Sequence, residues 1–272
     1  MRIEITRGAA WEYAWARPEG LRPWVDHQWA FRGPTVNRFK RVFPNGCVEL
    51  IINFAEPYRT DGFIHDSVVV SGLSTAPLVI EQPAAQDVIA ARLTPAGARA
   101  LLGLPMEELA HRHVALGDLL GPVASELRDR CAGLEVEDRL RLLAAWLRAR
   151  LQPHPRDAAA WMVDALVESR GCASIEALRN HAGFSKRRVL ASFRDQVGLT
   201  PKRYARVLRF RHALTTLQGV APDTRLIEVA HAAGFYDQAH MNAEFRALGG
   251  VTPSTFLRAR HPVGDGSTAA DR

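Results

Sequence analysis

The N-terminal half of the chain alternates short apolar runs with turn-forming residues. Runs rich in β-branched residues lie at 47–54, 67–71 and 79–93, bounded by Gly, Pro, Asn or Asp. Such runs predict the strands of a small sheet. From residue 95 onward the apolar positions recur with a period near 3.6, which predicts helices at 96–102, 116–120, 123–131 and 138–151. We therefore expect a β-rich body with a helical appendage.

A proline-containing segment, Gln152-Pro153-His154-Pro155-Arg156, interrupts the helical pattern. Because a residue that precedes proline is disfavoured in the α region, this segment predicts an interdomain linker. After residue 260 the chain is rich in Gly, Ser, Asp and Ala, which predicts a disordered tail. The expected organisation is one domain at 1–152, a second at 153–260, and a tail at 261–272.

The second domain contains an internal repeat of 51 to 52 residues. Ala182-Gly183-Phe184, Phe193-Arg194 and Gly198-Leu199-Thr200-Pro201 recur as Ala233-Gly234-Phe235, Phe245-Arg246 and Gly250-Val251-Thr252-Pro253. Each copy predicts a short helix, a turn in which glycine takes a positive φ, and a second amphipathic helix that ends at a glycine. This is the pattern of a helix-turn-helix unit, present twice.

The outer faces of the two second helices differ in chemistry. In the first copy Ser185 is the expected N-cap, and the residues left outside the apolar stripe include Lys186, Arg187, Arg188, Ala191 and Arg194. In the second copy Asp223 or Thr224 is the expected start of the first helix and Asp237 that of the second. With Met241 and Phe245 inward, the outer face offers Gln238, Ala239, Asn242 and Arg246. Amides and arginines form bidentate pairs with adenine and guanine edges in the major groove.

One long helix is predicted to connect the two copies. Pro201 suits its first turn, and apolar residues from Tyr204 to Leu217 follow at helical spacing. A helix of roughly 17 residues spans about 25 Å, which suits two recognition helices in successive major grooves about 34 Å apart.

Charge is distributed unevenly along this chain of 272 residues, which has a net charge of +6. Residues 1–152 carry 18 basic and 18 acidic side chains, whereas residues 153–260 carry 16 and 9. Nine basic residues and one acid, Asp195, lie between Lys186 and Arg211. This density suits a polyanion such as nucleic acid, although a solvated basic face would give the same count.

The C-terminal motifs resemble those of the AraC/XylS family of transcription regulators. The resemblance covers Ser174 to Tyr204, the connecting helix, and Ile227 to Phe256 with its Gly-Phe-Tyr-Asp-Gln run. It implies a seven-helix, two-unit DNA-binding domain that follows an effector or dimerisation domain. The candidate DNA-contacting residues are Ser185, Lys186, Arg187, Arg188, Ala191, Arg194, Lys202, Tyr236, Gln238, Ala239, Asn242 and Arg246.

The N-terminal half also resembles a known domain. Residues 43–50, 71–75 and 93–98 are similar to an uncharacterised N-terminal domain of actinobacterial and proteobacterial members of that family. It is regarded as a small cupin-like sensor, and no ligand follows from the likeness. The expected fold class is α+β: a β-rich, cupin-like domain with a helical appendage, then an all-α double helix-turn-helix domain.

The sequence departs from the family pattern at several positions. Arg179 replaces a small residue in the first supporting helix, so its stem must lie along the apolar surface. Met241 replaces the usual aromatic residue and Ala243 the usual arginine, while Asp237 and Glu244 add negative charge. We therefore expect the first unit to supply most of the affinity, and the second either to read bases or to act as a brace.

Other kinds of site have little support in the sequence. His111-Arg112-His113 lacks further metal ligands at suitable spacing, so exposed or capping histidines are expected. Core packing is expected for the tryptophans of the first 30 residues, and burial for Cys47, Cys131 and Cys172. No nucleophile elbow, phosphate loop or zinc signature indicates an enzyme. We expect no cofactor and no metal.

The expected partners follow from these motifs. Operator double-stranded DNA is the main one, and the N-terminal domain is expected to bind a small-molecule effector or to form a homodimer. RNA polymerase is a further partner if the chain is an activator. No signal peptide or long apolar stretch is found, so a cytoplasmic protein without membrane contact is expected.

Overall fold

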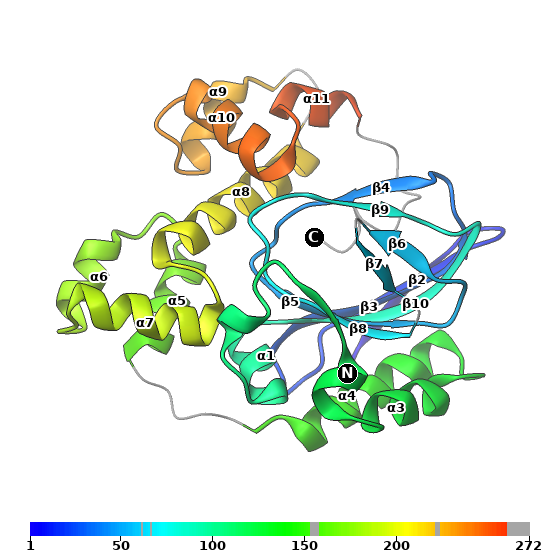
Figure 1. Cartoon of the computed structure of the whole chain (residues 1–272). Coiled ribbons are helices and arrows are strands. Elements are labelled where there is room, and N and C mark those ends of the chain that lie inside the picture. Colours follow the sequence, from blue (N-terminus) through cyan, green and yellow to red (C-terminus); the bar gives the residue numbers. More distant parts are fainter. Residues whose placement is uncertain (61, 66, 153–157, 221–223, 260–272) are drawn as a thin grey trace.

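The structure, a computed structural model, describes residues 1–60, 62–65, 67–152, 158–220 and 224–259 (Figure 1). Strands dominate the first hundred residues and helices the rest, as the apolar pattern predicts. The strands are β1 (Ile3–Arg7), β2 (Glu12–Ala16), β3 (Val25–Pro34), β4 (Phe39–Val42), β5 (Val48–Asn53), β6 (Tyr58–Thr60), β7 (Phe63–His65), β8 (Val68–Ser71), β9 (Leu78–Glu81), β10 (Ala85–Leu93) and β11 (His113–Ala115).

Within the described residues these strands form two antiparallel sheets. The seven-stranded sheet has the order β1-β2-β3-β10-β5-β8-β11, and the four-stranded sheet has the order β4-β9-β6-β7. The smaller sheet lies over one face of the larger one (Figure 1). A cavity remains between them, lined on one side by β3, β5 and β10 and on the other by β4 and β9.

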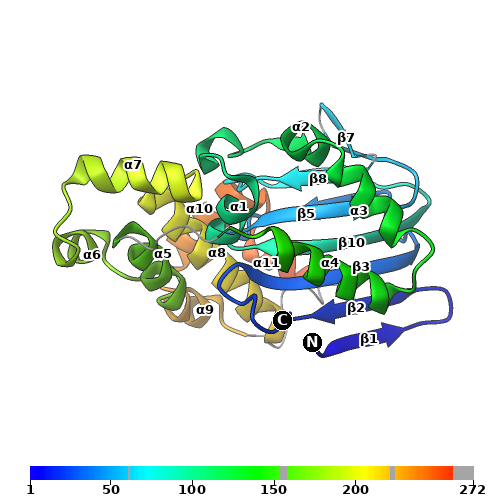
Figure 2. The same ribbon diagram turned by 90° about the horizontal axis from the view of Figure 1, so that it is seen from below.

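The other face of the large sheet is covered by helices (Figure 2). In β5, Leu50 and Ile52 are fully buried and join the hydrophobic core that also contains Leu127 and Leu143 of the helices. Glu49, at an odd position of the same strand, points into the cavity instead. Because side chains alternate along a strand, one strand supplies both the core and the cavity wall.

The helical appendage follows the sheet in sequence. It consists of α1 (Pro95–Leu102), the 3₁₀ turn η1 (Met106–Glu108), α2 (Leu116–Leu120), α3 (Val123–Cys131) and α4 (Val136–Arg150). Its packing on the sheet includes a buried ion pair, in which Arg139 Nη1 lies 2.6 Å from Asp87 Oδ1. The α+β class and the β-rich first part with helical appendage are therefore confirmed.

The C-terminal part is helical throughout its described residues. Its helices are α5 (Ala158–Glu168), α6 (Ile175–His181), α7 (Lys186–Val197), α8 (Pro201–Gly219), α9 (Leu226–Ala232), α10 (Gln238–Gly249) and α11 (Pro253–Arg258). Phe210, Met241 and Phe245 are fully buried in a cluster formed by α8, α9 and α10. None of the described helices is long and apolar enough to cross a membrane.

The two parts of the chain are packed against each other. One hydrophobic cluster contains Leu101 and Met106 from the appendage together with Phe193 and Val197 of α7. Of the expected linker at 152–156, residues 153–156 lie outside the described residues, and so does the expected disordered tail at 261–272. The division at 152/153 therefore stays a prediction. Side chains from both sides of it share one hydrophobic cluster.

Two smaller expectations are wrong. His113 lies in strand β11 beside β8, half-buried against the cavity, rather than in an exposed or capping position. Cys172 is exposed, whereas Cys47 and Cys131 are buried as expected. The tryptophans of the first 30 residues pack against the hydrophobic clusters as expected, and Trp29 in addition lines the cavity and donates its Nε1–H to Glu49 Oε2 at 3.4 Å.

Candidate nucleic-acid interface

The first helix-turn-helix unit has the predicted local structure. Ser174 caps α6, and Ser185 caps α7 by accepting a hydrogen bond from the Arg188 backbone N–H at 3.2 Å. Between the helices Gly183 has φ 66°, a conformation that favours glycine. Gly198 ends α7 in the left-handed region. Val189, Phe193 and Val197 are buried, which fixes the face of α7 that points away from the protein.

That outer face carries the sequence-predicted residues of the first unit. All six are exposed: Ser185, Lys186, Arg187, Arg188, Ala191 and Arg194. The Arg188 guanidinium lies over the Phe184 ring, 4.1 Å from its centroid, which holds the side chain at the start of α7. The small Ala191 leaves room for a groove edge to approach. This face can therefore meet both phosphates and base edges.

Helix α8 begins immediately after the first unit. Thr200 caps it by accepting from the Arg203 backbone N–H, and Pro201 occupies the first turn. Lys202 is exposed there, as predicted, and so is its neighbour Arg203, which the sequence reasoning did not select. The spacing of the buried Tyr204, Val207 and Leu208 could have indicated Arg203, because it leaves that position outside.

The second unit repeats this architecture with different surface chemistry. Gly234 has φ 78° in the turn, and Asp237 caps α10 by accepting from the His240 backbone N–H at 2.7 Å. The first helix of this unit, α9, begins at Leu226, later than the predicted Asp223 or Thr224. Thr252 and Pro253 start α11 as Thr200 and Pro201 start α8, so the repeat extends to the helix that follows each unit.

The predicted residues of the second unit are not equally accessible. Tyr236 is 87% exposed, and Ala239 and Arg246 are exposed as well. Gln238 and Asn242 are only half-buried, and Asn242 Oδ1 is buried without a hydrogen-bond partner. The exposed His240, missed at the sequence level, lies beside Ala239. The outer face of α10 is therefore centred on Ala239 and Arg246, with the amides at its edge.

Intramolecular contacts occupy several of the basic side chains that the sequence displays. Glu244 Oε2 lies 2.8 Å from Arg206 Nε of α8, so the acid that sequence reasoning placed against DNA is paired within the protein. Arg209 Nη1 donates to the Gly171 carbonyl at 2.6 Å, and Arg211 Nη2 to Asp26 Oδ2 at 3.0 Å. Three of the nine basic residues between 186 and 211 thus bind protein groups, and the other six are exposed.

The Arg211 contact joins α8 to the N-terminal domain. Burial alone would raise the pKa of Asp26, but the hydrogen bond with His27 and the charge of Arg211 more than offset this and hold that pKa below its ordinary value. A second contact lies at the end of α10, where Arg41 Nη1 donates to the carbonyls of Gly249 and Gly250 at 3.1 and 3.0 Å. The connecting helix and the second recognition unit are therefore both held to the first domain.

Comparisons with known proteins agree with this geometry. A family described as a helix-turn-helix domain matches residues 178–259, which include both recognition helices. The chain carries an AraC-type helix-turn-helix domain. A family described as a domain of unknown function (DUF6597) matches residues 17–115, which include strands β3 to β11. No curated protein matches the sequence.

Solved structures are similar to this chain only at a distance. ToxT from Vibrio cholerae O395 has a TM-score of 0.45 and 10% identity, covering 81% of this chain and 97% of ToxT. ToxT bound to (E)-4-(8-methylnaphthalen-1-yl)but-3-enoic acid has a TM-score of 0.46 and 11% identity, covering 82% and 99%. The AraC-like transcriptional activator CuxR has a TM-score of 0.29 and 13% identity, covering 75% and 83%. At these scores no ligand or partner is carried over to this chain.

The AraC-type helix-turn-helix domain gives the coarse function, which is DNA binding in transcription regulation. Within the described residues, no group of three or more His, Cys, Asp or Glu side chains is arranged to hold a metal ion.

Proposed function

We propose that this chain is a sequence-specific transcription regulator that places α7 and α10 in adjacent major grooves of one operator. The observation that carries the proposal is the doubling of a capped helix-turn-helix unit about one continuous helix. Helix α8 has 19 residues and so spans about 28 Å. This length suits recognition helices that enter the groove about one helical turn apart.

The two recognition helices have different roles in this proposal. In α7, Arg187, Arg188 and Ala191 face base edges while Lys186 and Arg194 contact phosphates, and Lys202 adds a phosphate contact from α8. In α10, Gln238, Ala239 and Asn242 read bases, with Tyr236 and Arg246 beside the backbone. Ser185 contributes from the cap of α7. The uneven charge of the two faces supports this division.

Control is assigned to the domain at residues 1–152. Arg41 and Asp26 of this domain bind Gly249, Gly250 and Arg211 of the DNA-binding region at 153–260. Either a small-molecule effector or pairing with a second copy of the chain can act through these contacts. RNA polymerase is a partner if the regulator activates.

Selection from random double-stranded DNA with the full chain tests the proposal. We expect enrichment of two short half-sites whose centres lie about 10 base pairs apart. The double substitution Arg187→Ala, Arg188→Ala should abolish enrichment of one half-site. Arg130→Ala, which removes an exposed arginine of α3, is the matched control and should leave the motif unchanged. Binding without any enriched motif would indicate a backbone-shape binder and contradict the proposal.

A further inference from the structure

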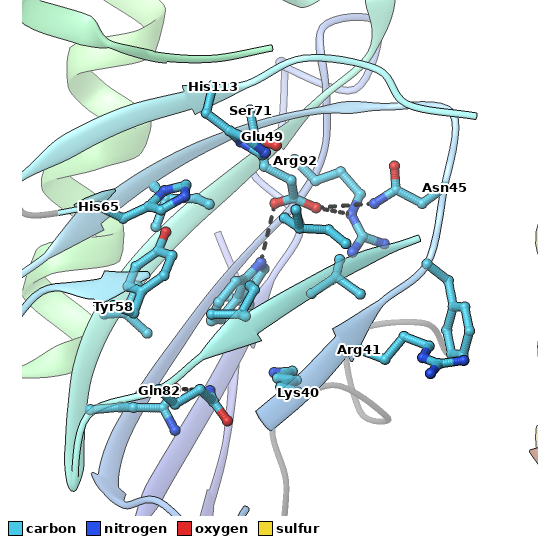
Figure 3. A pocket seen from close by; sticks show the side chains of 18 of the residues that line it. Lys40, Arg41, Asn45, Glu49, Tyr58, His65, Ser71, Gln82, Arg92 and His113 are labelled. Atoms are coloured by element: carbon cyan, nitrogen blue, oxygen red, sulfur yellow. Dashed lines mark hydrogen bonds and ion pairs between the residues drawn. The ribbon is translucent and has the colours of Figure 1, made fainter. Parts of the chain in front are cut away.

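The cavity between the two sheets has no role in DNA contact. Its volume is about 180 Å³, which exceeds the roughly 150 Å³ of an engineered cavity that binds benzene. Its walls are largely apolar and aromatic, formed by residues that include Trp29, Ile51, Tyr58, Ile80 and Val88. Figure 3 shows Tyr58 and His65 side by side at one end and Arg41 at the other.

The charged side chains of the lining already have partners. Glu49 Oε1 accepts from Arg92 Nε at 2.6 Å and from Asn45 Nδ2 at 3.2 Å, as the dashed lines of Figure 3 mark. Arg41 donates to two backbone carbonyls, and Lys40 also has an interaction partner. A charged ligand would therefore have to break one of these pairs or remain uncompensated in a largely buried site, and both outcomes are costly.

Three buried polar atoms of the lining, in contrast, have no hydrogen-bond partner: His65 Nδ1, His113 Nδ1 and Gln218 Oε1. Burial lowers the pKa of His65 to about 3, with the neighbouring His113 adding to the effect, and burial also lowers the pKa of His113. Both rings are therefore neutral near pH 7, and each has a donor and an acceptor nitrogen. Buried polar groups are normally paired with a protein group, an ordered water or a ligand, so these three atoms are available to a bound molecule.

The cavity also contacts the DNA-binding region. Leu214 and Gln218 of α8 and Phe256 of α11 belong to its lining. Phe43, another lining residue, packs edge-on against Phe210 and Phe256, with ring centroids 6.0 and 5.8 Å apart. Because α8 connects the two recognition units, a molecule in this cavity touches the helix that sets their separation.

Asn45 provides a second connection between the cavity and α8. Its side-chain amide donates to Glu49 inside the cavity, and its backbone carbonyl accepts from Arg211 Nη1 of α8 at 3.3 Å. Residues 43–49 thus lie between the cavity and the helix. Residues 43–50 are part of the N-terminal resemblance found in the sequence, and none of them is among the candidate DNA-contacting residues.

From these observations we infer that the cavity binds an uncharged, ring-sized molecule with hydrogen-bonding groups at its edge, and that this molecule regulates DNA binding through α8 and α11. A molecule somewhat larger than benzene fits the volume. Its ring packs between the apolar walls, and its polar edge pairs with His65, His113 and Gln218. The regulatory half of this inference rests on the proposed function, whereas the binding half does not.

Thermal unfolding of the full chain tests the binding half. The probes are benzamide, benzoate and benzamidinium, which have nearly the same size and differ in charge. We expect benzamide to raise the Tm by about 3 °C at ten times its Kd, and the two ions to raise it less. No shift with benzamide at 10 mM, or a larger shift with benzoate or benzamidinium, would overturn the assignment.

Two residues of β9 provide matched variants. Ile80 lines the cavity, whereas its neighbour Val79 is 49% exposed on the opposite face. Ile80→Trp should fill the cavity and remove the benzamide shift, and Val79→Trp should keep it. If Ile80→Trp does not fold, Gln218→Leu at the α8 side should reduce benzamide affinity at least threefold. A full shift in the folded cavity-filling variant, or unchanged affinity in Gln218→Leu, would contradict the site.

Operator affinity with and without benzamide tests the regulatory half. We expect the probe to change the Kd for the selected operator by at least threefold in the native chain and not in Ile80→Trp. Bound probe with unchanged operator affinity would overturn the coupling through α8. Failure to select any operator would overturn the proposed function. The unfolding measurements would still show whether the cavity binds benzamide.

Discussion

Arg188 and Lys202 carry the same charge but occupy different positions relative to DNA. Arg188 lies in the first turn of α7 over the Phe184 ring, whereas Lys202 lies at the start of α8 without an aromatic support. Arg188→Ala should cost about 1–3 kcal/mol on the selected operator and flatten the preference at one base position, since a bidentate contact to guanine is lost. Binding isotherms on single-base operator variants measure both effects.

Lys202→Ala is the corresponding change at a phosphate contact. It should weaken binding to all sequences by the same factor, because a phosphate contact carries no base information. If Arg188→Ala weakened all operator variants equally, α7 would be an anchoring helix and base recognition would have to come from elsewhere.

His65 gives the cavity a pH dependence that can be measured without any ligand. The side chain is 1% exposed, stacks on Tyr58, and has a pKa lowered to about 3 by burial. The unfolded chain binds a proton at His65 below about pH 6.5, while the folded chain does not. The contribution of His65 to the free energy of unfolding is therefore fully present above pH 6.5. It is lost as the pH falls towards 3, by at most about 1.4 kcal/mol for each pH unit.

His65→Phe keeps a ring on Tyr58 but cannot titrate. Between pH 6.5 and 4, the slope of the unfolding free energy against pH should be smaller in this variant by up to about 1.4 kcal/mol per pH unit, which corresponds to one proton. The exposed His231 is the control, and His231→Gln should leave the slope as it is. An unchanged slope in His65→Phe would mean that His65 titrates alike in both states.

At the scale of the element, α10 shows how exposure modifies a prediction made from residue type. Gln238 and Asn242 can pair with adenine, but both are half-buried at the edge of the helix face. Gln238→Ala and Asn242→Ala should reduce discrimination between bases more than total affinity, because neither side chain carries charge. Competition between specific and random DNA measures this ratio. Two unaffected variants would make the second unit a structural brace.

The glycines that end the two recognition helices occupy equivalent positions with different surroundings. Gly198 has φ 83° and a Cβ there would lie 2.5 Å from the Met106 carbonyl oxygen, a backbone atom of η1. Gly250 has φ 65°, and its nearest neighbour would be the flexible Arg41 side chain at 3.2 Å. Both alanine variants incur about 1–2 kcal/mol for left-handed backbone. Gly198→Ala should destabilise the chain further in urea unfolding, and equal losses would show that the contact with η1 is loose.

The elements of this fold were largely predictable, whereas the contacts between them were not. Capping residues, turn glycines and apolar spacing are local properties, so Ser185, Gly183 and the stripe from Val189 to Val197 were identified from sequence. The buried position of His113 and the exposure of Cys172 depend on which distant strands and turns meet. The same is true of Arg206, whose pairing with Glu244 joins residues 38 positions apart.

At the scale of the whole molecule, the sequence indicated two domains but not how they share a surface. Arg211 binds Asp26 across 185 positions, and Phe43 packs between Phe210 and Phe256. No periodicity reports such contacts, because they depend on the relative placement of two folded units. Their consequence is that the charge offered to DNA is smaller than the composition suggests.

The salt dependence of DNA binding measures how many charges meet the phosphates. Of the nine basic residues between 186 and 211, six are exposed and three bind protein groups, and Arg246 adds one exposed charge on α10. Each neutralised phosphate contributes about −0.9 to the slope of log K against log salt. If the phosphate contacts come from this segment and Arg246, the slope for the full chain should be no steeper than about −6, whereas contact by all nine together with Arg246 would give about −9.

Two variants separate the exposed from the internally bound arginines and lysines. Lys202→Ala should make the slope shallower by about 0.9, because an exposed lysine releases a counterion when it meets a phosphate. Arg209→Ala should leave the slope unchanged, since its guanidinium donates to the Gly171 carbonyl. A slope near −9 in the native chain, or a loss of about 0.9 in Arg209→Ala, would mean that the contacts of α8 with the protein open when DNA binds. In that case the charge of the whole segment from Lys186 to Arg211 would become available only in the complex.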